Sequence, residues 1–435
     1  MATGPDLHDT RPAAAGTPAD RAGSEAGSVA LGAVIFGGSA SGLWILNRLV
    51  RAGHSALLIE ADRLGQGQTA ACQGIIHGGL KYTLDGRLSA SAKAIRSMPS
   101  VWRQCLAGER APALTDGVLR APYCHLWHSG RVLGRLGLVG ARRGLRVTPV
   151  PLRHEDRPPA LADVRGEVCR LDEQVVSPRR LIANLARPLA NRLLRVEPDA
   201  VGIERRADGD VEIVLDPDRS AAAGALPLVI EARVVVLAAG TGNAALRARF
   251  GLSTDLMQVR SVQMLLARGD LPVLNGHCIE GAAALVTITS DRDAAGRTVW
   301  QIGGGVSEDH IDLDSGAFIR RGRRIVEAAL GGRSLAGTEW AAYRADKAEV
   351  TTAGGHRPAD AFARIDGRVI TAWPTKLALV PRLAERVLAL AAPLLPEPRG
   401  ERPRASLLER QRRGWPAPAL APPPWEREVP WTAAA

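Results

Sequence analysis

The stretch SVALGAVIFGGSASGLWILNRLVRAGHSALLIEADRLG, residues 28–65, decides the fold of this chain. An apolar run, 33–36, meets a cluster of glycines, and apolar residues then recur at helical spacing from Leu43 to Val50. A second apolar run, 56–59, ends in the acidic residue Glu60. These periods predict a strand, a turn, a helix and a second strand, which together form a βαβ unit with parallel strands.

The turn of this unit, GGSASG at 37–42, has the pattern of a dinucleotide-binding loop. Gly37 stands where the strand must turn sharply, and Gly42 stands where the helix packs close to the strand and aims its amino end at a pyrophosphate. Glu60 stands where a carboxylate accepts hydrogen bonds from ribose hydroxyls. Ser39 replaces the middle glycine of the pattern, and Gly38 beside it could relax the turn. Three hypotheses stay open for this loop: a dinucleotide site, a plain strand-helix turn, and a binder with an impaired site.

Two later segments favour the dinucleotide site. LVIEARVVVLAAGTGNAALRARF, residues 228–250, predicts a buried strand that stops at Ala-Gly-Thr-Gly and leads into a helix. DGRVITAWPTKLALVPRLAERVLALAAPLL predicts a strand over 368–372, a break at Trp373-Pro374, and a long amphipathic helix that starts near Thr375. We expect these three strand ends to converge on one cofactor.

The segments between these units have a different hydrophobic pattern. They contain short apolar or alternating runs separated by turn residues, at 262–268, 283–290 and 298–302. They predict an antiparallel sheet, and 315–330 predicts a helix. The fold class is therefore α/β, with a discontinuous Rossmann-like nucleotide-binding domain and an inserted antiparallel β-sheet domain that binds the substrate. The expected divisions are a disordered leader at 1–28, the nucleotide-binding domain at 29–95, 172–255 and 340–396, the substrate-binding domain at 96–171 and 256–339, and a proline-rich tail at 397–435.

The tail contains Trp415, Trp425 and Trp431 among many prolines. Such a segment is extended. Two alternatives stay open: the tryptophans clamp the tail to the body, or the tail is flexible.

Composition limits the possible compartments and partners. The net charge of +11 comes almost entirely from scattered arginines, with no run of five or six like charges, so we expect no dedicated nucleic-acid surface. The five cysteines contain no CxxC pair, which favours a reducing compartment. No apolar stretch approaches the ~20 residues of a membrane helix. We expect a cytoplasmic protein, with peripheral membrane contact left open. His125 and His128 lack a third ligand nearby, so we expect no metal site.

Three motifs, VIFGGSASGL, VVVLAAGTGN and TKLALVPRLAE, resemble those of the FAD-dependent oxidoreductases of the D-amino-acid oxidase superfamily. The resemblance covers about 30–395, and no second glycine fingerprint for a separate NAD domain follows the first. It implies FAD as cofactor and a closing helix whose amino end faces the flavin pyrimidine ring. The cofactor-binding residues it implies are Gly37, Gly38, Ser39, Gly42, Glu60, Thr69, Ala70, Gly74, Gly78, Gly79, Val201, Ala239, Gly240, Thr375, Lys376 and Leu377.

Within that superfamily, IIHGGLKY at 75–82 is most similar to the glycerol-3-phosphate dehydrogenases, and the L-2-hydroxyglutarate dehydrogenases have a related pattern. The resemblance implies that Lys81 and Tyr82 bind an anionic group of the substrate. Lys81 stands where that family has arginine and cannot bind a phosphate in bidentate geometry, so a phosphorylated substrate is in doubt. His77 is expected either to accept a hydroxyl proton or to buttress the flavin.

Two further cations are expected in the site. Lys376, at the amino end of the closing helix, would stabilise the negative charge of the reduced flavin. Arg357, in GGHRP, matches a superfamily arginine that binds a substrate carboxylate or phosphate, with Arg344 as its competitor. His277, Cys278 and Glu280 are expected in a structural loop, with a position on the sheet over the flavin as the alternative.

The sequence therefore predicts an FAD-dependent dehydrogenase or oxidase. It would oxidise a small, polar, anionic substrate at a CH-OH carbon by hydride transfer to flavin N5, with His77 and Lys376 as catalytic residues. The electron acceptor, oxygen or a quinone, is left open. One alternative is an amine (CH-NH) oxidase of the glycine or sarcosine oxidase type. A second is a flavoprotein module that acts on RNA or binds it.

Overall fold

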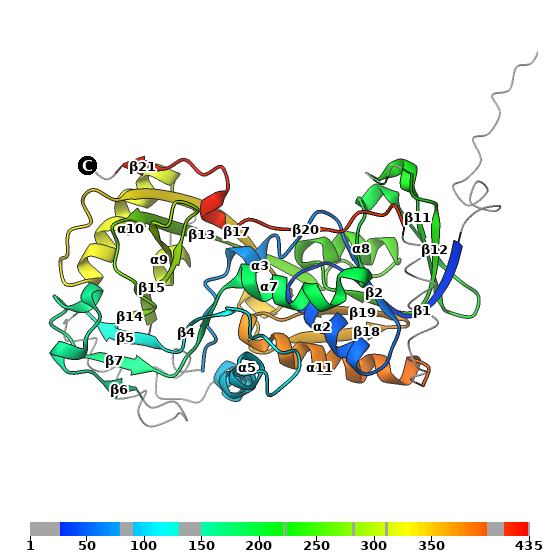
Figure 1. Cartoon of the computed structure of the whole chain (residues 1–435), viewed down its shortest axis with the longest axis horizontal. Coiled ribbons are helices and arrows are strands. Elements are labelled where there is room, and N and C mark those ends of the chain that lie inside the picture. The colour runs from blue at the N-terminus through cyan, green and yellow to red at the C-terminus, as the bar shows by residue number, and fades with distance from the viewer. Residues whose placement is uncertain are drawn as a thin grey trace, which may run out of the picture.

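Two large β-sheets with helices packed on them make up most of the computed structural model, which describes residues 27–78, 90–129, 149–220, 222, 224–280, 283–308, 312–397 and 413–433. The two sheets lie side by side along the long axis of the molecule (Figure 1). Among these described residues, no helix combines the length and the apolar character needed to cross a membrane.

The first sheet carries the predicted βαβ unit and runs in the order β10-β11-β12-β1-β2-β9, with β19 paired to β12 and β18 to β19. β1 is parallel to both β12 and β2, and β12 is parallel to β19. The strands are β1 (Gly27–Phe36), β2 (Ala56–Glu60), β9 (Leu193–Arg195), β10 (Val201–Arg205), β11 (Val211–Leu215), β12 (Leu228–Leu237), β18 (Phe362–Asp366) and β19 (Val369–Trp373). The α/β, Rossmann-like prediction is confirmed.

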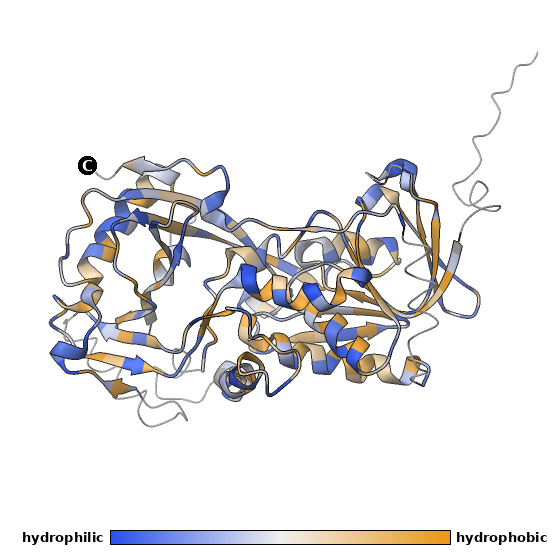
Figure 2. Cartoon of the chain, in the orientation of Figure 1, coloured by the Kyte–Doolittle hydropathy of each residue, from blue (hydrophilic) through white to orange (hydrophobic). Residues whose placement is uncertain are grey.

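Helices α2 (Ala40–Arg51) and α11 (Val380–Ala391) cover one face of this sheet. Their apolar side chains, among them Leu43, Leu46 and Leu383, form one buried cluster with residues of β1 and β19. Figure 2 shows hydrophobic residues where these helices meet the sheet. The other helices are α3 (Gln68–Ala71), α4 (Ala90–Ile95), α5 (Met98–Leu106), α7 (Pro178–Ala186), α8 (Asn243–Arg249), α9 (Gly305–Glu308) and α10 (Ser315–Ala329).

The second sheet runs in the order β21-β17-β13-β16-β15-β14-β5-β7-β6. All its pairs are antiparallel except β14 with β5, and α10 packs on it through Phe318 and Val326. Its strands are β5 (Cys124–His128), β6 (Val150–Pro151), β7 (Val168–Leu171), β13 (Met257–Gly269), β14 (Gly276–Glu280), β15 (Ala283–Arg292), β16 (Thr298–Gly303), β17 (Glu339–Val350) and β21 (Thr432–Ala433).

The division into two domains stays a prediction, but one strand differs from it in sheet membership. β17 pairs with β13 over its whole length and so belongs to the second sheet, whereas the sequence division placed 340–396 in the nucleotide-binding domain. The apolar character of a strand indicates that it is buried but not which neighbour it pairs with.

The closing helix begins later than predicted. Thr375 has a positive φ of 62°, and Lys376 is extended with φ −140° and ψ 144°, so neither residue is helical. A 3-10 turn over Leu377–Leu379 leads into α11 at Val380. The start near Thr375 was therefore wrong by several residues, because the corner after β19 must turn the chain before the helix can begin.

The C-terminal segment 413–433 crosses from the first sheet to the second along one side of the molecule (Figure 1, red). Its strand β20 (Ala419–Leu420) pairs with β3 (Arg63–Leu64), and β21 pairs with β17. Trp415 and Trp425 are buried, and the guanidinium carbon of Arg268 lies 3.9 Å from the ring centroid of Trp431. In this part of the tail, the tryptophans therefore clamp the segment to the body.

Candidate active site and cofactor cradle

The turn after β1 is built from backbone with almost no room for side chains. Gly37 has φ +105°, and a β carbon on it would lie 2.6 Å from the Cα atom of Ala239. A β carbon on Gly38 would lie 2.4 Å from a methyl group of Leu64. Ser39 is the N-cap of α2, and its hydroxyl accepts a hydrogen bond from the N–H of Gly42 at 3.4 Å. The serine thus completes the turn as a helix cap.

Glu60 reaches back from the end of β2 to this turn. Its Oε2 atom accepts a hydrogen bond from the N–H of Gly38 at 2.5 Å, and its Oε1 atom accepts one from the N–H of Asp62 at 3.0 Å. Burial raises the pKa of the Glu60 carboxyl, and these backbone hydrogen bonds oppose the shift without cancelling it.

The segment after β3 folds over the same turn. The hydroxyl of Thr69 accepts a hydrogen bond from the N–H of Ala40 at 3.3 Å, and the N–H of Ala70 donates to the carbonyl of Gly65 at 2.9 Å. Thr69 and Ala70 are therefore close to the glycine turn. Gly74 lies further along, where a β carbon would be 2.0 Å from the carbonyl oxygen of Val176.

The three predicted strand ends lie together. β1 and β12 are neighbours, which places the Gly37 turn against Ala239. The indole N–H of Trp373, at the end of β19, donates to the carbonyl of Gly240 at 3.2 Å. Asn243 joins the same two segments, because its amide donates to the carbonyl of Ala372 at 3.3 Å and its Oδ1 accepts from the N–H of Ala239 at 2.8 Å.

The corner after β19 holds a residue in a conformation that side chains disfavour. Thr375 adopts φ 62°, and its hydroxyl donates to the carbonyl of Asp360 at 3.0 Å. The Asp360 carboxylate is held in turn by Arg382 and Arg386 on α11. Strained backbone of this kind persists where the surroundings over-determine it, often at functional sites. Lys376 follows directly and is buried, with 9 % of its surface exposed.

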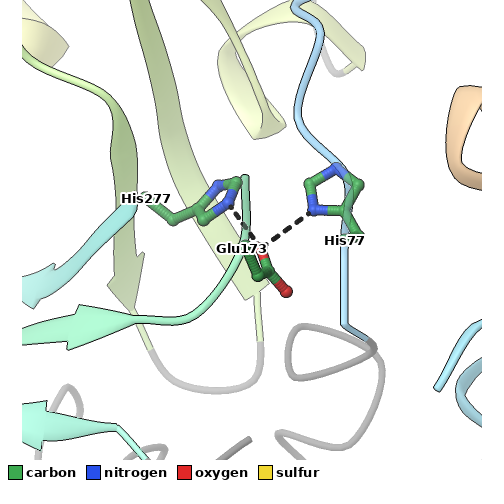
Figure 3. A group of neighbouring side chains, drawn as sticks. All are labelled: His77, Glu173 and His277. Carbon is green, nitrogen blue, oxygen red and sulfur yellow. Dashed lines mark hydrogen bonds and ion pairs between the residues drawn. The ribbon is translucent and has the colours of Figure 1, made fainter. Parts of the chain in front are cut away.

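Two histidines and a glutamate from distant parts of the chain meet in a second cluster (Figure 3). The Nδ1 atom of His77 lies 3.3 Å from Oε2 of Glu173, and the Nε2 atom of His277 lies 3.6 Å from the same oxygen. The other carboxylate oxygen, Oε1, accepts a hydrogen bond from the N–H of Gly78 at 2.6 Å. We call His77, Glu173 and His277 the His-Glu-His cluster.

The carboxylate of this cluster is ionised although it is buried. Burial alone would raise the pKa of Glu173, but the imidazoles of His277 and His77 beside the carboxylate hold that pKa well below its usual range. The three candidate ligand atoms lie within 4.8 Å of one another, so within the described residues this is the group that could hold a metal ion.

Sequence reasoning missed Glu173, and for His277 it favoured a structural loop over the alternative of a position on the sheet. Glu173 follows β7 between Asp172 and Gln174, and its histidine partners are about a hundred positions away on either side, so no local pattern indicates it. His277, expected in a loop, lies on strand β14, where its ring faces Glu173 and its Nδ1 atom lies 2.9 Å from the hydroxyl of Thr287. The β-branched residues of β15 opposite give this short segment its strand partner.

Other predicted residues lie outside these two groups. Arg357 is half-buried and forms an ion pair with Glu308 of α9, whereas its competitor Arg344 is exposed on β17. Val201 begins β10, and its carbonyl accepts a hydrogen bond from Arg249. Gly79, Lys81 and Tyr82 lie outside the described residues. The roles of all these residues stay predictions.

The cradle fits the phosphates and ribose of a dinucleotide. Bare backbone at Gly37 and Gly38 allows close approach, and the N-terminal end of α2 behind Ser39 carries the partial positive charge that a pyrophosphate requires. The parallel strands lie in the order β9-β2-β1-β12-β19, and the cradle lies at their carboxyl ends. The fold and the site together define a dinucleotide-binding protein of the Rossmann-like class.

Comparison with known proteins identifies the family. Residues 33–370 match the family of FAD dependent oxidoreductases. The chain is 36 % identical over 401 residues to the probable FAD-dependent oxidoreductase PA4991 of Pseudomonas aeruginosa, a match that covers 90 % of this chain and 97 % of that protein. This chain therefore belongs to the FAD dependent oxidoreductase family and is an enzyme that uses FAD.

Solved structures agree with this assignment. The crystal structure of PA4991 superposes with a TM-score of 0.73 at 33 % identity, covering 92 % of this chain and 98 % of that one. Glycine oxidase of Geobacillus kaustophilus gives a TM-score of 0.58 at 16 % identity over 84 % of this chain and 95 % of that one. L-α-glycerophosphate oxidase of Mycoplasma pneumoniae with FAD bound gives 0.54 at 14 % identity over 93 % of this chain and 100 % of that one. The last two likenesses show the shared fold and leave the substrate open.

Proposed function

We propose that this FAD-dependent oxidoreductase oxidises a small, polar, anionic substrate at a CH-OH carbon, with His77 as the acceptor of the hydroxyl proton. Bound FAD supplies the two-electron acceptor, which takes the hydride at ring nitrogen N5. The substrate carbon loses a hydride and its hydroxyl loses a proton, so a C=O bond forms and the electrons balance.

The observation that carries the proposal is the imidazole of His77 beside a buried, ionised carboxylate. A CH-OH donor must lose its hydroxyl proton as the hydride leaves, and a positioned histidine is a common general base for this step. A neutral amine carries its own lone pair and needs no such base. The 3.3 Å separation of His77 Nδ1 from Glu173 Oε2 therefore favours a hydroxyl substrate over an amine.

We assign three cations to the binding of an anionic substrate and of a negatively charged reduced cofactor. Lys376 is buried at the corner that precedes the closing helix, where its ammonium would stabilise negative charge on the reduced ring. Arg357 pairs with Glu308, so a substrate carboxylate that binds this guanidinium must replace that side chain. Lys81 and Tyr82 are further proposed contacts for the substrate anion.

We place the reaction in the cytoplasm, with oxygen or a quinone as the acceptor that reoxidises the cofactor. All five cysteines are free, and four of them are buried, as is common for a protein of a reducing compartment.

Anaerobic substrate screening tests the proposal. Purified protein with bound FAD is mixed with 2-hydroxy acids, polyol phosphates, glycine, sarcosine and other amino acids, and bleaching of the visible flavin band is followed. We expect a hydroxy compound to bleach the band. Amino acids that bleach it while every hydroxy compound leaves it intact would favour the amine oxidase instead.

A histidine pair serves as the control for the base. We expect His77→Asn to retain FAD and to slow its reduction by the hydroxy substrate about 100-fold, the usual range for loss of a general base. His125→Asn, on β5, removes a histidine that lies against the carbonyl of Asn275 and should leave the rate unchanged. Equal rates for His77→Asn and wild-type protein would remove His77 from the reaction.

A further inference from the structure

The carboxylate of Glu173 joins three segments that are far apart in the chain. One oxygen receives the backbone N–H of Gly78, and the other faces the Nδ1 atom of His77 and the Nε2 atom of His277. Only 2 % of the Glu173 surface is exposed. A buried charge is costly unless it is paired and hydrogen-bonded, so these contacts are what keep the carboxylate in place.

We propose that Glu173 is the positioning residue of the proton transfer to His77 and that His277 supports it from the other side. The inference rests on the proposed function, because it assigns the residues that prepare His77 as a base. None of these roles follows from a local sequence motif.

The first step of the argument concerns the tautomer of His77. A carboxylate can only accept hydrogen bonds, so the Nδ1 atom that faces Glu173 must carry the proton. The lone pair then lies on Nε2, which is the atom that can accept a proton from the substrate. The other oxygen of the same carboxylate, Oε1, accepts the backbone N–H of Gly78, so Glu173 holds both the ring of His77 and the backbone that follows it.

The second step concerns His277. Its Nδ1 atom lies 2.9 Å from the hydroxyl of Thr287, which can donate to it and so leaves the proton on Nε2, toward Glu173. At 3.6 Å the Nε2 contact is longer than a hydrogen bond, whereas that of His77 is shorter by 0.3 Å. The Nε2–H group of His277 therefore partly compensates the negative charge of Glu173, while His77 remains the closer partner of the carboxylate.

The third step concerns charge. When a proton reaches His77, the ring becomes an imidazolium beside an anion in a buried site, and the pair is stabilised. The titratable groups that face Glu173 from the described residues are His77, His277 and Cys124. Burial, with the charge of Glu173 adding to it, raises the pKa of the Cys124 thiol well above its ordinary value, so Cys124 stays neutral.

Two variants with opposite expected shifts test the inference. In Glu173→Gln the imidazolium loses its anion, so we expect about 100-fold slower turnover of the hydroxy substrate, a nearly unchanged KM, and an acid limb of the pH–rate profile displaced to lower pH. Glu173→Asp should restore part of the rate. In His277→Phe the carboxylate loses its second imidazole and binds the imidazolium more strongly, so the acid limb should move to higher pH.

Controls keep the outcomes distinct. Glu349→Gln removes another fully buried carboxylate, which pairs with Arg260 on the second sheet, and should change neither rate nor profile. FAD content and circular dichroism verify that each variant folds, and His277→Phe decides the matter if Glu173→Gln does not. An unshifted acid limb overturns the inference. A bound zinc ion would also overturn the inference. Mass spectrometry would then find one equivalent of zinc in the wild-type holoenzyme and none in Glu173→Gln.

The inference and the proposed function can fail separately. Wild-type protein that oxidises only amines overturns the proposed function and this inference with it. Wild-type protein that oxidises a hydroxy substrate, with Glu173→Gln unshifted, overturns the inference alone.

Discussion

Gly42 of α2 lies directly on the carbonyl of Gly37, so close that a β carbon on Gly42 would be 1.9 Å from that oxygen. No real β carbon tolerates such a contact, and both partners are backbone that cannot move without opening the turn. The first helix and the first strand can therefore meet in this way only if residue 42 is glycine.

Gly42→Ala should therefore lose FAD. We expect protein that purifies colourless, or with FAD affinity reduced at least 10-fold, because the added methyl group pushes the helix amino end away from the pyrophosphate. Fluorescence titration of FAD with the variant measures this. Gly242→Ala, in the bend after β12, is the matched control, because a β carbon there meets its nearest neighbour at 3.4 Å and φ is −68°. Equal FAD affinity in both variants would contradict the cradle.

The variant Lys376→Met should still bind FAD, but the bound flavin should be reduced more slowly. The ammonium is buried at the corner before the closing helix, so its removal should destabilise the negatively charged reduced cofactor. Loss of one such electrostatic contact typically costs about 100-fold in rate. Stopped-flow spectroscopy measures the rate of flavin reduction. The control is Lys347→Met, which changes a lysine of β17 that pairs with Glu308. Reduction at the wild-type rate would show that Lys376 is not catalytic.

FAD binding should weaken in acid through Glu60. Because burial raises the pKa of this carboxyl, it becomes protonated at a higher pH than an ordinary glutamate, and affinity should fall as the pH drops through that raised value. Glu60→Gln should lower FAD affinity about 10-fold at neutral pH, the usual worth of a hydrogen bond to a charged group, and flatten this pH dependence. Glu204→Gln, exposed on β10, is the control. A steep acid dependence that persists in Glu60→Gln would assign it to another group.

The C-terminal segment should contribute measurably to stability. Trp425 is buried against Leu266, Val299 and Ala341 of the second sheet. We expect Trp425→Ala to cost about 3 kcal/mol, the lower end for a buried aromatic residue. Trp431→Ala should cost about 1 kcal/mol, because this ring stacks on Arg268 at the surface. Urea unfolding measures both, and equal, negligible losses would mean that the segment does not bind tightly.

Several features were readable from local sequence, and others were not. The end of the first strand, over 33–36, and the bend after Leu237 were predicted, since apolar runs and glycines carry their own signal. The helix start near Thr375 was not, because the positive φ of that residue is imposed by its hydrogen bond to Asp360 and by the turn that follows β19. For His277 a loop was preferred to the sheet, because five residues with a bordering glycine do not distinguish strand from loop.

The sequence by itself determined that this chain forms a βαβ unit with a glycine turn at its first strand and further strands that end at similar bends. Those signals lie within a few residues of one another, and steric limits on the backbone make them specific. Only the tertiary structure decided that Glu173 stands between His77 and His277. A carboxylate pairs with whatever the fold brings to it, and partners about a hundred residues away leave no periodicity in the sequence.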